Sequence, residues 1–263
     1  MHLKRSSARA HCPHSLQALL EPAPGDVHRL ELSLVRSWPP SPPFHASLAE
    51  EHALYAKYQA AVHNDSPLEC NLKQFQRFLC TSPLLPLSHQ GPLAAPHGYG
   101  SFHQHYRLDG KLIAVGVLDV LTTCVSSVYF FYDPDYHFLN LGTYSALHEI
   151  RLVQQLHLLD PAITSYYLGF YVHSCRKMRY KGSFKPSFLL DPEVFTWHRI
   201  EECRSKLDVA KYSRFADASA VDADECEDVS EVMIRVKFRD AQQSRLVRFA
   251  EFCELLTPSY VPT

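Results

Sequence analysis

The stretch "SFHQHYRLDGKLIAVGVLDVL", residues 101–121, determines the fold class of this chain. Its first eight residues mostly alternate between polar and apolar side chains. Asp109 and Gly110 follow as a dipeptide that favours a tight hairpin turn. The apolar run that starts at Lys111 has the composition of a buried strand. The sequence therefore predicts two antiparallel strands joined by a short turn.

The residues after this hairpin complete an α+β pattern. The aromatic run "SSVYFFY" (126–132) predicts a third antiparallel strand, and "DPDY" (133–136) ends it. A helix is expected at 141–159 and a further apolar strand, "TSYYLGFYVHS", at 164–174. This order predicts a mixed, mainly antiparallel sheet flanked by helices, as in the GNAT-like acyltransferase fold. Topology alone is weak evidence for such a fold, because many α+β domains share it.

Two helices are expected before the hairpin. The first covers 47–65, with Ser47 as its N-cap and Glu50 three residues further on, as in a capping box. The second covers 71–82, with Asn71 as its N-cap.

Composition divides the chain into four segments. Residues 1–46 are proline-rich and expected to be poorly ordered, apart from a possible edge strand at 27–35. Residues 47–215 are expected to form one acyltransferase-like catalytic domain. An acidic stretch without aromatic residues, 216–231, predicts a flexible insert, and 232–263 predicts a final strand and helix.

The length, net charge and cysteine spacing of the chain exclude several classes of protein. The 263 residues suffice for one large domain or two small ones, and a formal charge of -2 gives no general attraction to polyanions. The 8 cysteines form no C-x-x-C pair and follow no metal-site spacing, so we expect reduced thiols and no metal. We find neither an apolar run of the roughly 20 residues that a membrane span needs nor a secretory signal. We therefore expect no membrane partner and a cytoplasmic location, with the nucleus as a second one.

One segment, "SCRKMRYKGSFK" (174–185), departs from the overall charge balance. Cations at this density can pair with phosphates, and aromatic rings among them can stack on unpaired bases, so the segment is a candidate RNA-binding element. The alternatives are a solvated basic turn or an ionic partner for the acidic insert. The candidate RNA-binding residues are Arg176, Lys177, Arg179, Tyr180, Lys181 and Lys185, and Phe184 lies beside them.

Three long segments between Tyr99 and Trp197 resemble the arginyl-tRNA–protein transferase family. They are "GYGSFHQHYRLDGKLIAVGVLDVL", "SSVYFFYDPDYHFLNLGTYSALHEI" and "YYLGFYVHSCRKMRYKGSFKPSFLLDPE". Two further segments, "YAKYQAAVHNDSP" and "FQRFLCTSPL", extend the resemblance upstream, so that it covers about residues 48–205.

The resemblance implies an aminoacyltransferase. Members of the family move arginine from arginyl-tRNA to the N-terminal amine of proteins that begin with Asp, Glu or oxidised Cys. The product is a degradation signal read by ubiquitin ligases. The implied partners are therefore arginyl-tRNA and acceptor proteins with acidic N-termini, and the implied catalytic half has an acyltransferase-like fold.

This chain departs from the family pattern in several places. The family's other half carries a cysteine cluster for a metal or iron–sulfur centre, which has no counterpart here, so we expect no cofactor in this chain. Arg176 stands where the family usually has proline, Asp191 where it usually has cysteine, and "LTTC" replaces a form with proline. These differences keep a second hypothesis open, a noncatalytic module that binds tRNA or substrates and regulates a full-length enzyme. A third hypothesis is an amine acyltransferase with another donor, although no glycine-rich pyrophosphate turn is present.

The reaction that the resemblance implies, aminolysis of an activated ester, needs groups that position the amine, bind the arginine cation and accept a proton. Two carboxylates are the catalytic candidates, Asp119 in the strand "VGVLDVL" and Glu149 in the helix "YSALHEI". Asp119 is equally compatible with a solvent-facing strand end, and an exposed helical position is the favoured reading of Glu149. The sequence does not decide which of them binds arginine.

The substrate-binding candidates lie on the first hairpin strand, the aromatic strand and the following helix start. Gln104 and Tyr106 share one face of their strand, and His103 points to the other. The residues at the helix start could lie near a bound anion, but simple capping explains their presence equally well. Most of the tyrosines are expected in the core. A Cys–His nucleophile from His173 and Cys175 is disfavoured, because no third group orients it. The candidates are His103, Gln104, Tyr106, Tyr129, Tyr132, Tyr144 and Ser145.

Overall fold

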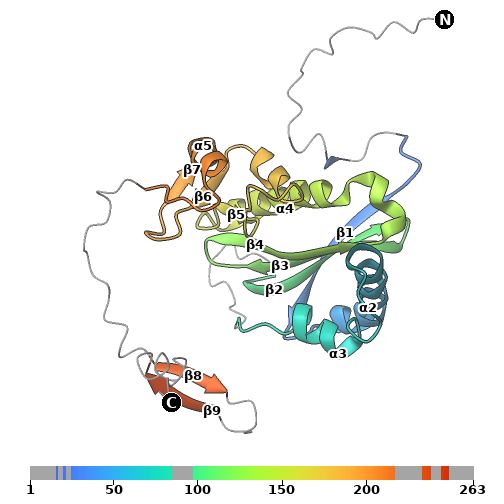
Figure 1. Ribbon diagram of the computed structural model, residues 1–263. Coiled ribbons are helices and arrows are strands. Elements are labelled where there is room, and N and C mark those ends of the chain that lie inside the picture. Colours follow the sequence, from blue (N-terminus) through green and yellow to red (C-terminus); the bar gives the residue numbers. More distant parts are fainter. Residues whose placement is uncertain are drawn as a thin grey trace, which may run out of the picture. The chain divides into compact units, whose positions relative to one another are not determined.

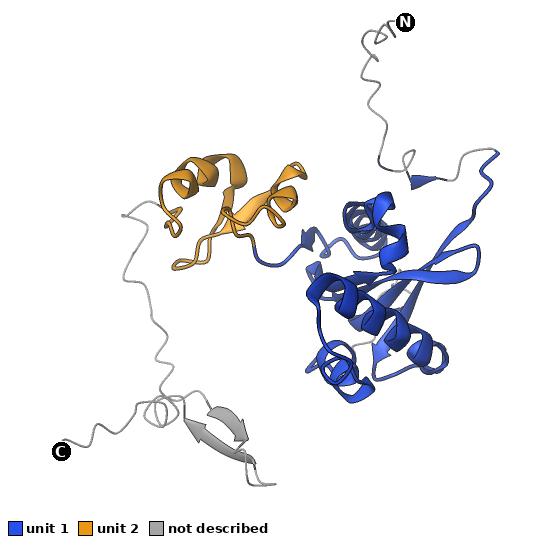
Figure 2. Cartoon of the chain, turned by 45° about the vertical axis from the view of Figure 1, so that its right-hand side comes forward, with its two compact units in different colours: residues 1–170 blue, residues 171–263 orange. Residues whose placement is uncertain are grey.

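The computed structural model describes residues 16, 20–21, 25–84 and 97–216, and the backbone of residues 233–237 and 244–248. The chain divides into two compact units, residues 1–170 and 171–263 (Figure 2). The boundary between the units lies inside the segment 47–215, which the sequence predicts to be one domain. The boundary falls within the stretch that was expected to be the last core strand.

Unit 1 is built on a five-stranded sheet in the order β1-β2-β3-β4-β5. The first four strands are antiparallel to their neighbours, and β5 is parallel to β4. Helix α4, Leu141–Leu159, connects β4 to β5 and has the bounds expected from the sequence. The expected α+β class with a mixed, mainly antiparallel sheet is confirmed. The strands are Leu30–Trp38, Gly100–Leu108, Lys111–Val120, Cys124–Tyr132 and Ser165–Tyr167.

Helices cover both faces of this sheet. Helices α2, Pro42–His63, and α3, Leu72–Phe75, lie on one face, and α4 lies on the other (Figure 1). Val115 and Val117 of β3 join the core under α2, whereas Leu118 packs with residues of α4. Because both faces of β3 are buried, its apolar residues are almost continuous along the chain.

The hairpin turn forms as the sequence indicates. Asp109 and Gly110 both have positive φ, 51° and 85°, and Leu108 pairs with Lys111 across the turn. Two central residues with positive φ match the right-handed twist of the flanking strands. The Asp109 carboxylate also accepts a hydrogen bond from the Arg29 backbone amide, at 2.8 Å, just before β1.

The start of α2 corrects the expected boundary at residue 47. Ser41 is the N-cap, the helix begins with two prolines, and Ser47 lies within it and donates to Glu51. Proline fits the first helical turn, where the backbone amides have no partner. Residues 30–46, expected to be poorly ordered, therefore form β1 and the first turn of α2. The expected edge strand is confirmed, at Leu30–Trp38.

Two other elements differ in length from the expectation. Asn71 caps α3 as predicted, and the helix continues as a π-helical turn, Gln76–Cys80. The strand expected at 164–174 covers only β5, Ser165–Tyr167, because Gly169 adopts a positive φ of 74° that turns the chain away. A 3-10 turn, Pro134–Leu139, links β4 to α4.

Between residues 171 and 216, unit 2 contains a small hairpin and one helix. β6, Phe188–Leu190, pairs with β7, Trp197–Arg199, and α5, Ile200–Val209, follows directly. A 3-10 turn, Arg179–Ser183, precedes the hairpin.

The C-terminal tail differs in part from the expectation. β8, Met233–Lys237, is the expected strand, but 244–248 forms a second strand, β9, instead of the start of a helix. Its residues pair in antiparallel register with β8, which the sequence pattern did not reveal. The acidic insert at 216–231 lies outside the described residues except Ala216. In the part of the chain that the structure describes, no helix is long and apolar enough to span a membrane.

A fully buried carboxylate joins α2 to the sheet. Glu51 accepts hydrogen bonds from Ser47 (2.7 Å) and from the imidazoles of His103 and His105. The other ring nitrogen of His103 donates to the Leu79 carbonyl at 2.9 Å. Both ring nitrogens of His103 thus have hydrogen-bond partners inside the buried network. Burial alone would raise the pKa of Glu51, but the two histidines lower it to about 2.

We expect Glu51→Gln to lower the free energy of unfolding by about 3 kcal/mol, because it removes the buried anion that accepts hydrogen bonds from both His103 and His105. Since the folded-state pKa of Glu51 is about 2 and the ordinary value is 4.5, the stabilisation is complete above pH 4.5. It is lost as the pH falls toward 2. Urea unfolding at several pH values checks this. Glu31→Gln, an exposed carboxylate on β1, is the control and should change stability little. An equal effect of both substitutions would contradict the expectation.

Candidate active site

Glu149 is buried in the middle of α4, with its side chain turned toward the sheet and 1% exposed. The exposed position favoured from the sequence is therefore wrong. Glu149 follows Ser145 and precedes Val153 at intervals of four residues, and all three lie on the buried face of α4. This spacing was readable in the sequence, but the charge of the residue argued against it.

The two carboxylate oxygens of Glu149 have different surroundings. Oε2 accepts a hydrogen bond of 2.6 Å from the Tyr166 hydroxyl on β5. Oε1 is buried and has no hydrogen-bond partner among the described residues. It lies over Gly116 of β3, where an added Cβ would be only 3.1 Å away. A glycine at this point of the strand therefore makes room for the carboxylate.

This environment brings the ionisation of Glu149 close to neutral pH. Burial raises the pKa of Glu149 to about 7, although the hydroxyls of Tyr166 and Ser127 act in the opposite direction. A carboxyl group with such a pKa exists in both protonation states at physiological pH. It can therefore accept or release a proton there.

Gln104 and Tyr106 lie beside Glu149, as their shared strand face predicted. The Tyr106 hydroxyl donates to Gln104 Oε1 at 2.8 Å, and both side chains are buried. Gln104 pairs with Gly116 in the sheet, which places it next to the glycine that Glu149 covers. Because Tyr106 occupies the oxygen of the Gln104 amide, the NH2 group remains to donate to a ligand.

A cavity of about 830 Å³ opens next to this cluster, between α4 and strands β1 and β2. His148 lines it, and its Nε2 atom is buried with no hydrogen-bond partner in the described structure. Burial, and then the charge of Arg151, lower the pKa of His148 to about 4, so the imidazole is neutral at pH 7. The cavity wall includes Leu32, Leu34, Gln104, Tyr144, His148 and Arg151.

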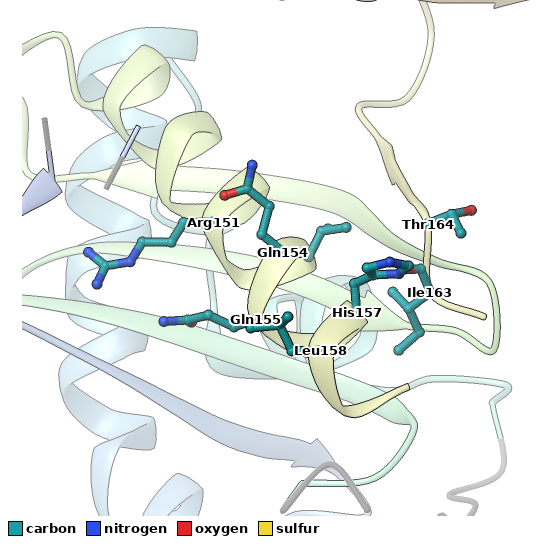
Figure 3. A pocket seen from close by; sticks show the side chains of 8 residues that line it. Arg151, Gln154, Gln155, His157, Leu158, Ile163 and Thr164 are labelled. Carbon is teal, nitrogen blue, oxygen red and sulfur yellow. The ribbon is translucent and has the colours of Figure 1, made fainter. Parts of the chain in front are cut away.

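A second cavity, of about 810 Å³, lies at the C-terminal half of α4 (Figure 3). His157 contributes to it and donates a hydrogen bond of 3.0 Å to the Ile163 carbonyl. None of the site residues expected from the sequence lines this cavity. The first cavity, together with Glu149, is therefore the candidate active site.

The structure separates the second carboxylate, Asp119, from Glu149. Asp119 pairs with Ser101 near the end of β3 and accepts a hydrogen bond from its hydroxyl. It alternates with Leu118 and thus points to the sheet face that carries α2. Burial raises the pKa of Asp119, and the Ser101 hydroxyl partly offsets this. No basic side chain among the described residues forms an ion pair with it.

The other five substrate-binding candidates have different surroundings. His103 is fully buried in the Glu51 network on the other face, which argues against a substrate contact. Tyr129 donates to Gln59 of α2 at 2.9 Å, and the ring of Tyr132 packs 5.1 Å from that of Tyr58. Ser145 lies inside α4 and donates to the carbonyl of the third residue before it, Gly142, while the N-cap position belongs to Asn140, so Ser145 does not cap the helix. Tyr144 lines the cavity with its ring 4.5 Å from that of His148.

The basic segment belongs to unit 2 and is largely exposed. Arg176, Lys177, Arg179 and Lys185 are exposed, while Lys181 is half-buried and burial lowers its pKa. Tyr180 is 39% exposed.

His173 in the same unit does have orienting groups, Asp208 at 2.7 Å and Tyr171 at 2.8 Å, contrary to the expectation. These contacts occupy both ring nitrogens, so a nucleophile made of His173 and Cys175 gains no support. Within the described ranges, no group of three His, Cys, Asp or Glu residues is placed to hold a metal ion.

Sequence reasoning missed three residues of the site. Gly116, a glycine inside an apolar strand, is the kind of signal that indicates close approach of another group. His148 stands next to Glu149 in the sequence but offered no sign of a cavity. Tyr166 was placed in a strand, and nothing in the sequence linked its hydroxyl to Glu149.

The mixed sheet, with helix α4 connecting the parallel strands β4 and β5, is consistent with an acyltransferase-like fold. The family described as "Arginine-tRNA-protein transferase, C terminus" matches residues 50–191 of the chain. The chain belongs to this family.

Several relatives are similar to this chain. "Arginyl-tRNA--protein transferase 1" of Drosophila melanogaster is 50% identical over 201 residues, which are 75% of this chain and 40% of the relative. The protein of the same name from Arabidopsis thaliana is 49% identical over 178 residues, 67% of this chain and 28% of the relative. The protein of the same name from Dictyostelium discoideum is 52% identical over 148 residues, which are 54% of this chain and 24% of the relative. The chain thus spans less than half the length of these curated relatives.

We expect Glu149→Gln to make the protein more stable than wild type at alkaline pH. The folded-state pKa of Glu149, about 7, exceeds the ordinary value of 4.5, so its contribution is fully present below pH 4.5. It is lost as the pH rises through 7, which costs up to about 3 kcal/mol. Denaturant unfolding at pH 4.5 and pH 8.5 measures the difference.

Two further variants make this measurement decisive. Tyr166→Phe removes a hydroxyl that lowers the pKa of Glu149. The pH range over which this variant loses stability should therefore extend to higher pH than in the wild type. Glu202→Gln, at an exposed position of α5, should keep the wild-type pH profile. If Glu149→Gln also follows the wild-type profile, the carboxyl group is not titrating near neutral pH.

Proposed function

We propose that this chain transfers arginine from arginyl-tRNA to the N-terminal amine of acceptor proteins. The observation that carries the proposal is Glu149, a buried carboxyl group with a pKa of about 7 and one oxygen without a hydrogen-bond partner in the described structure. It lies in the segment matched by the transferase family.

The chemistry of the reaction fits such a group. The α-amino group of an acceptor has a pKa of about 7.7 to 8.0, so it must lose a proton before or during attack on the arginyl ester. A base with a pKa near the working pH serves this step well. In the proposed mechanism, Glu149 takes a proton from the amine as its nitrogen bonds to the ester carbonyl carbon, and the amide NH2 of Gln104 donates to the developing oxyanion. The C–O bond to the tRNA ribose then breaks, and the proton on Glu149 passes to the leaving ribose oxygen.

The cavity beside Gln104 offers room for the reacting groups. Neutral His148 and the ring of Tyr144 line it, and the leucines of β1 form an apolar wall. We propose that positioning in this cavity supplies most of the rate enhancement, since the ester is already activated. Aminolysis of an ester needs no redox group, and we propose that the chain uses no cofactor of its own.

The finer parts of the proposal rest on the family resemblance. They are acceptors that begin with Asp, Glu or oxidised Cys, a role in ubiquitin-dependent degradation, and a location in the cytoplasm and nucleus. We further propose that the basic segment of unit 2, with exposed Arg176, Lys177, Arg179 and Lys185, contacts the tRNA.

A second candidate function is a noncatalytic module that binds tRNA or acceptors and regulates a longer enzyme. The observation that favours it is the exposed basic segment of unit 2, which can bind RNA without taking part in catalysis. The two functions differ in whether purified chain forms a peptide bond.

The decisive test is transfer of radiolabelled arginine from arginyl-tRNA to a peptide that begins with Asp, with a Val-initiated peptide as control. Wild type should label the Asp peptide only. Glu149→Gln should lower kcat by roughly 100-fold, the usual scale for loss of a general base, and abolish the rise of rate with pH through about 7.

The kinetic constants separate the possible outcomes. A variant that raises KM for arginyl-tRNA with kcat unchanged would make Glu149 an arginine-binding group instead of a base. Asp119→Asn, on the other face of the sheet, should retain activity. A folded wild-type chain that labels neither peptide would overturn the transferase proposal in favour of the binding module.

A further inference from the structure

The described part of unit 2 is strongly cationic although the whole chain is nearly neutral. Residues 171–216 hold ten Lys or Arg and five Asp or Glu, a formal charge of +5, against -2 for all 263 residues. A local concentration of positive charge attracts polyanions to one part of a protein. The partner of this part of unit 2 is therefore expected to be anionic.

One face of the β6–β7 hairpin presents aromatic rings next to a cation. Phe188 pairs with Arg199, and Leu190 pairs with Trp197, so these four side chains point to the same side. Phe188 is 44% exposed, Trp197 is 56% exposed and Arg199 is also exposed, with its guanidinium 5.9 Å from the Phe188 ring centre.

The opposite face of this hairpin is covered. Leu189 and His198 point to it and are half-buried, and the His198 ring lies 6.2 Å from that of Phe215. The hairpin thus has one packed side and one side on which the rings of Phe188 and Trp197 are about half exposed. Exposed aromatic residues on a supported hairpin mark an interaction surface.

A buried carboxylate holds the turn of this hairpin rigidly. Asp191 accepts four backbone hydrogen bonds, from Glu193, Val194, Phe215 and Ala216, at 2.6 to 2.9 Å. Burial would raise the pKa of Asp191, but these four amides hold it well below the ordinary range, so the anchor stays ionised.

The same turn presents one more aromatic ring. Phe195 is 70% exposed and has a φ of 55°, which is unfavourable for a side chain of this size. Such strain persists only where the surroundings enforce it, and it is typical of functional sites.

We propose that the aromatic face of the β6–β7 hairpin, formed by Phe188, Trp197 and Arg199, stacks on unpaired bases of RNA. Aromatic rings that stack on bases, combined with cations that pair with phosphates, are the general means of binding single-stranded nucleic acid. The ligand that this chemistry fits is the single-stranded 3′ end of the donor tRNA. In this last respect the inference rests on the proposed function.

This proposal adds the hairpin residues to the RNA-binding surface and gives the hairpin and the basic segment different roles. Arg176, Lys177, Arg179 and Lys185 would supply charge, and the hairpin would supply base contacts. Charge pairs weaken with salt, whereas stacking does not depend on phosphate neutralisation. The two contributions can therefore be measured separately.

The test uses the full chain with Trp38→Phe, which leaves Trp197 as its only tryptophan, because the sequence has two. Titration with a short single-stranded oligoribonucleotide ending in CCA should quench the Trp197 fluorescence. Inorganic polyphosphate, which has charge but no bases, should bind without comparable quenching.

Affinity is measured separately, by fluorescence anisotropy of the labelled oligoribonucleotide. Trp197→Ala should weaken its binding roughly 10- to 100-fold, as expected for loss of base stacking, and leave polyphosphate binding unchanged. Phe138→Ala, a 65% exposed aromatic residue of unit 1, is the matched control and should change neither.

Three results would overturn the inference. They are equal quenching by polyphosphate, RNA binding that Trp197→Ala does not weaken, and Trp197 emission already shielded from acrylamide in the absence of RNA. The last would mean that another part of the protein covers this face. A chain that transfers arginine but shows one of these results disproves the stacking surface alone. A chain that shows the stacking signals without transfer disproves only the transferase proposal.

Discussion

The central strand of the sheet, β3, must be covered on both faces, and the rest of unit 1 follows from this requirement. Its apolar residues pack against α2 and α3 on one side and against α4 on the other. The hairpin turn at Asp109 and Gly110 fixes its register with β2. A single glycine in the strand, Gly116, leaves the space in which the Glu149 carboxylate lies. The same packing that forms the core thus positions the group to which we assign the chemistry.

The sheet separates two buried carboxyl groups with opposite properties. Glu51, on the α2 side, has two imidazole partners and remains ionised, so its role is to hold the layers together. Glu149, on the α4 side, is stabilised by hydroxyl groups only, and its pKa is raised to about 7. Both residues are acidic, buried and helical, and only their partners distinguish them. An unfavourable environment for the charge of Glu149 costs stability and supplies a base suited to neutral pH.

Unit 2 is organised around a different anionic anchor. Asp191 neutralises no cation and instead binds four backbone amides, which ties the β6–β7 turn to residues 215 and 216. It stands where the resembling family usually has cysteine, a side chain that accepts hydrogen bonds only weakly. This anchor lets a short hairpin keep large aromatic side chains exposed in a strongly cationic part of the chain. The near-neutral charge of the whole chain therefore conceals a local surface suited to a polyanion.

The sequence alone determined the local structure and the family of this protein. Alternation, the turn dipeptide and helical spacing located β2, β3, β4 and α4, because these signals depend on neighbouring residues only. The long resembling segments identified the family, and their strand pattern placed Gln104 and Tyr106 on one face. The proline-rich start of α2 and the strand β9 were misread, since proline at a helix start resembles a linker and strand pairing depends on a distant partner.

Only the tertiary structure shows that the two candidate carboxylates lie on opposite faces of the sheet. From the sequence, an exposed helical position is favoured for Glu149, and Asp119 is equally compatible with a buried or a solvent-facing position. In the fold, Glu149 is buried, Tyr166 and Gly116 meet it from separate strands, and Asp119 turns to the opposite face. The pKa of a side chain depends on what surrounds it in space, and residues far apart in the chain supply those surroundings.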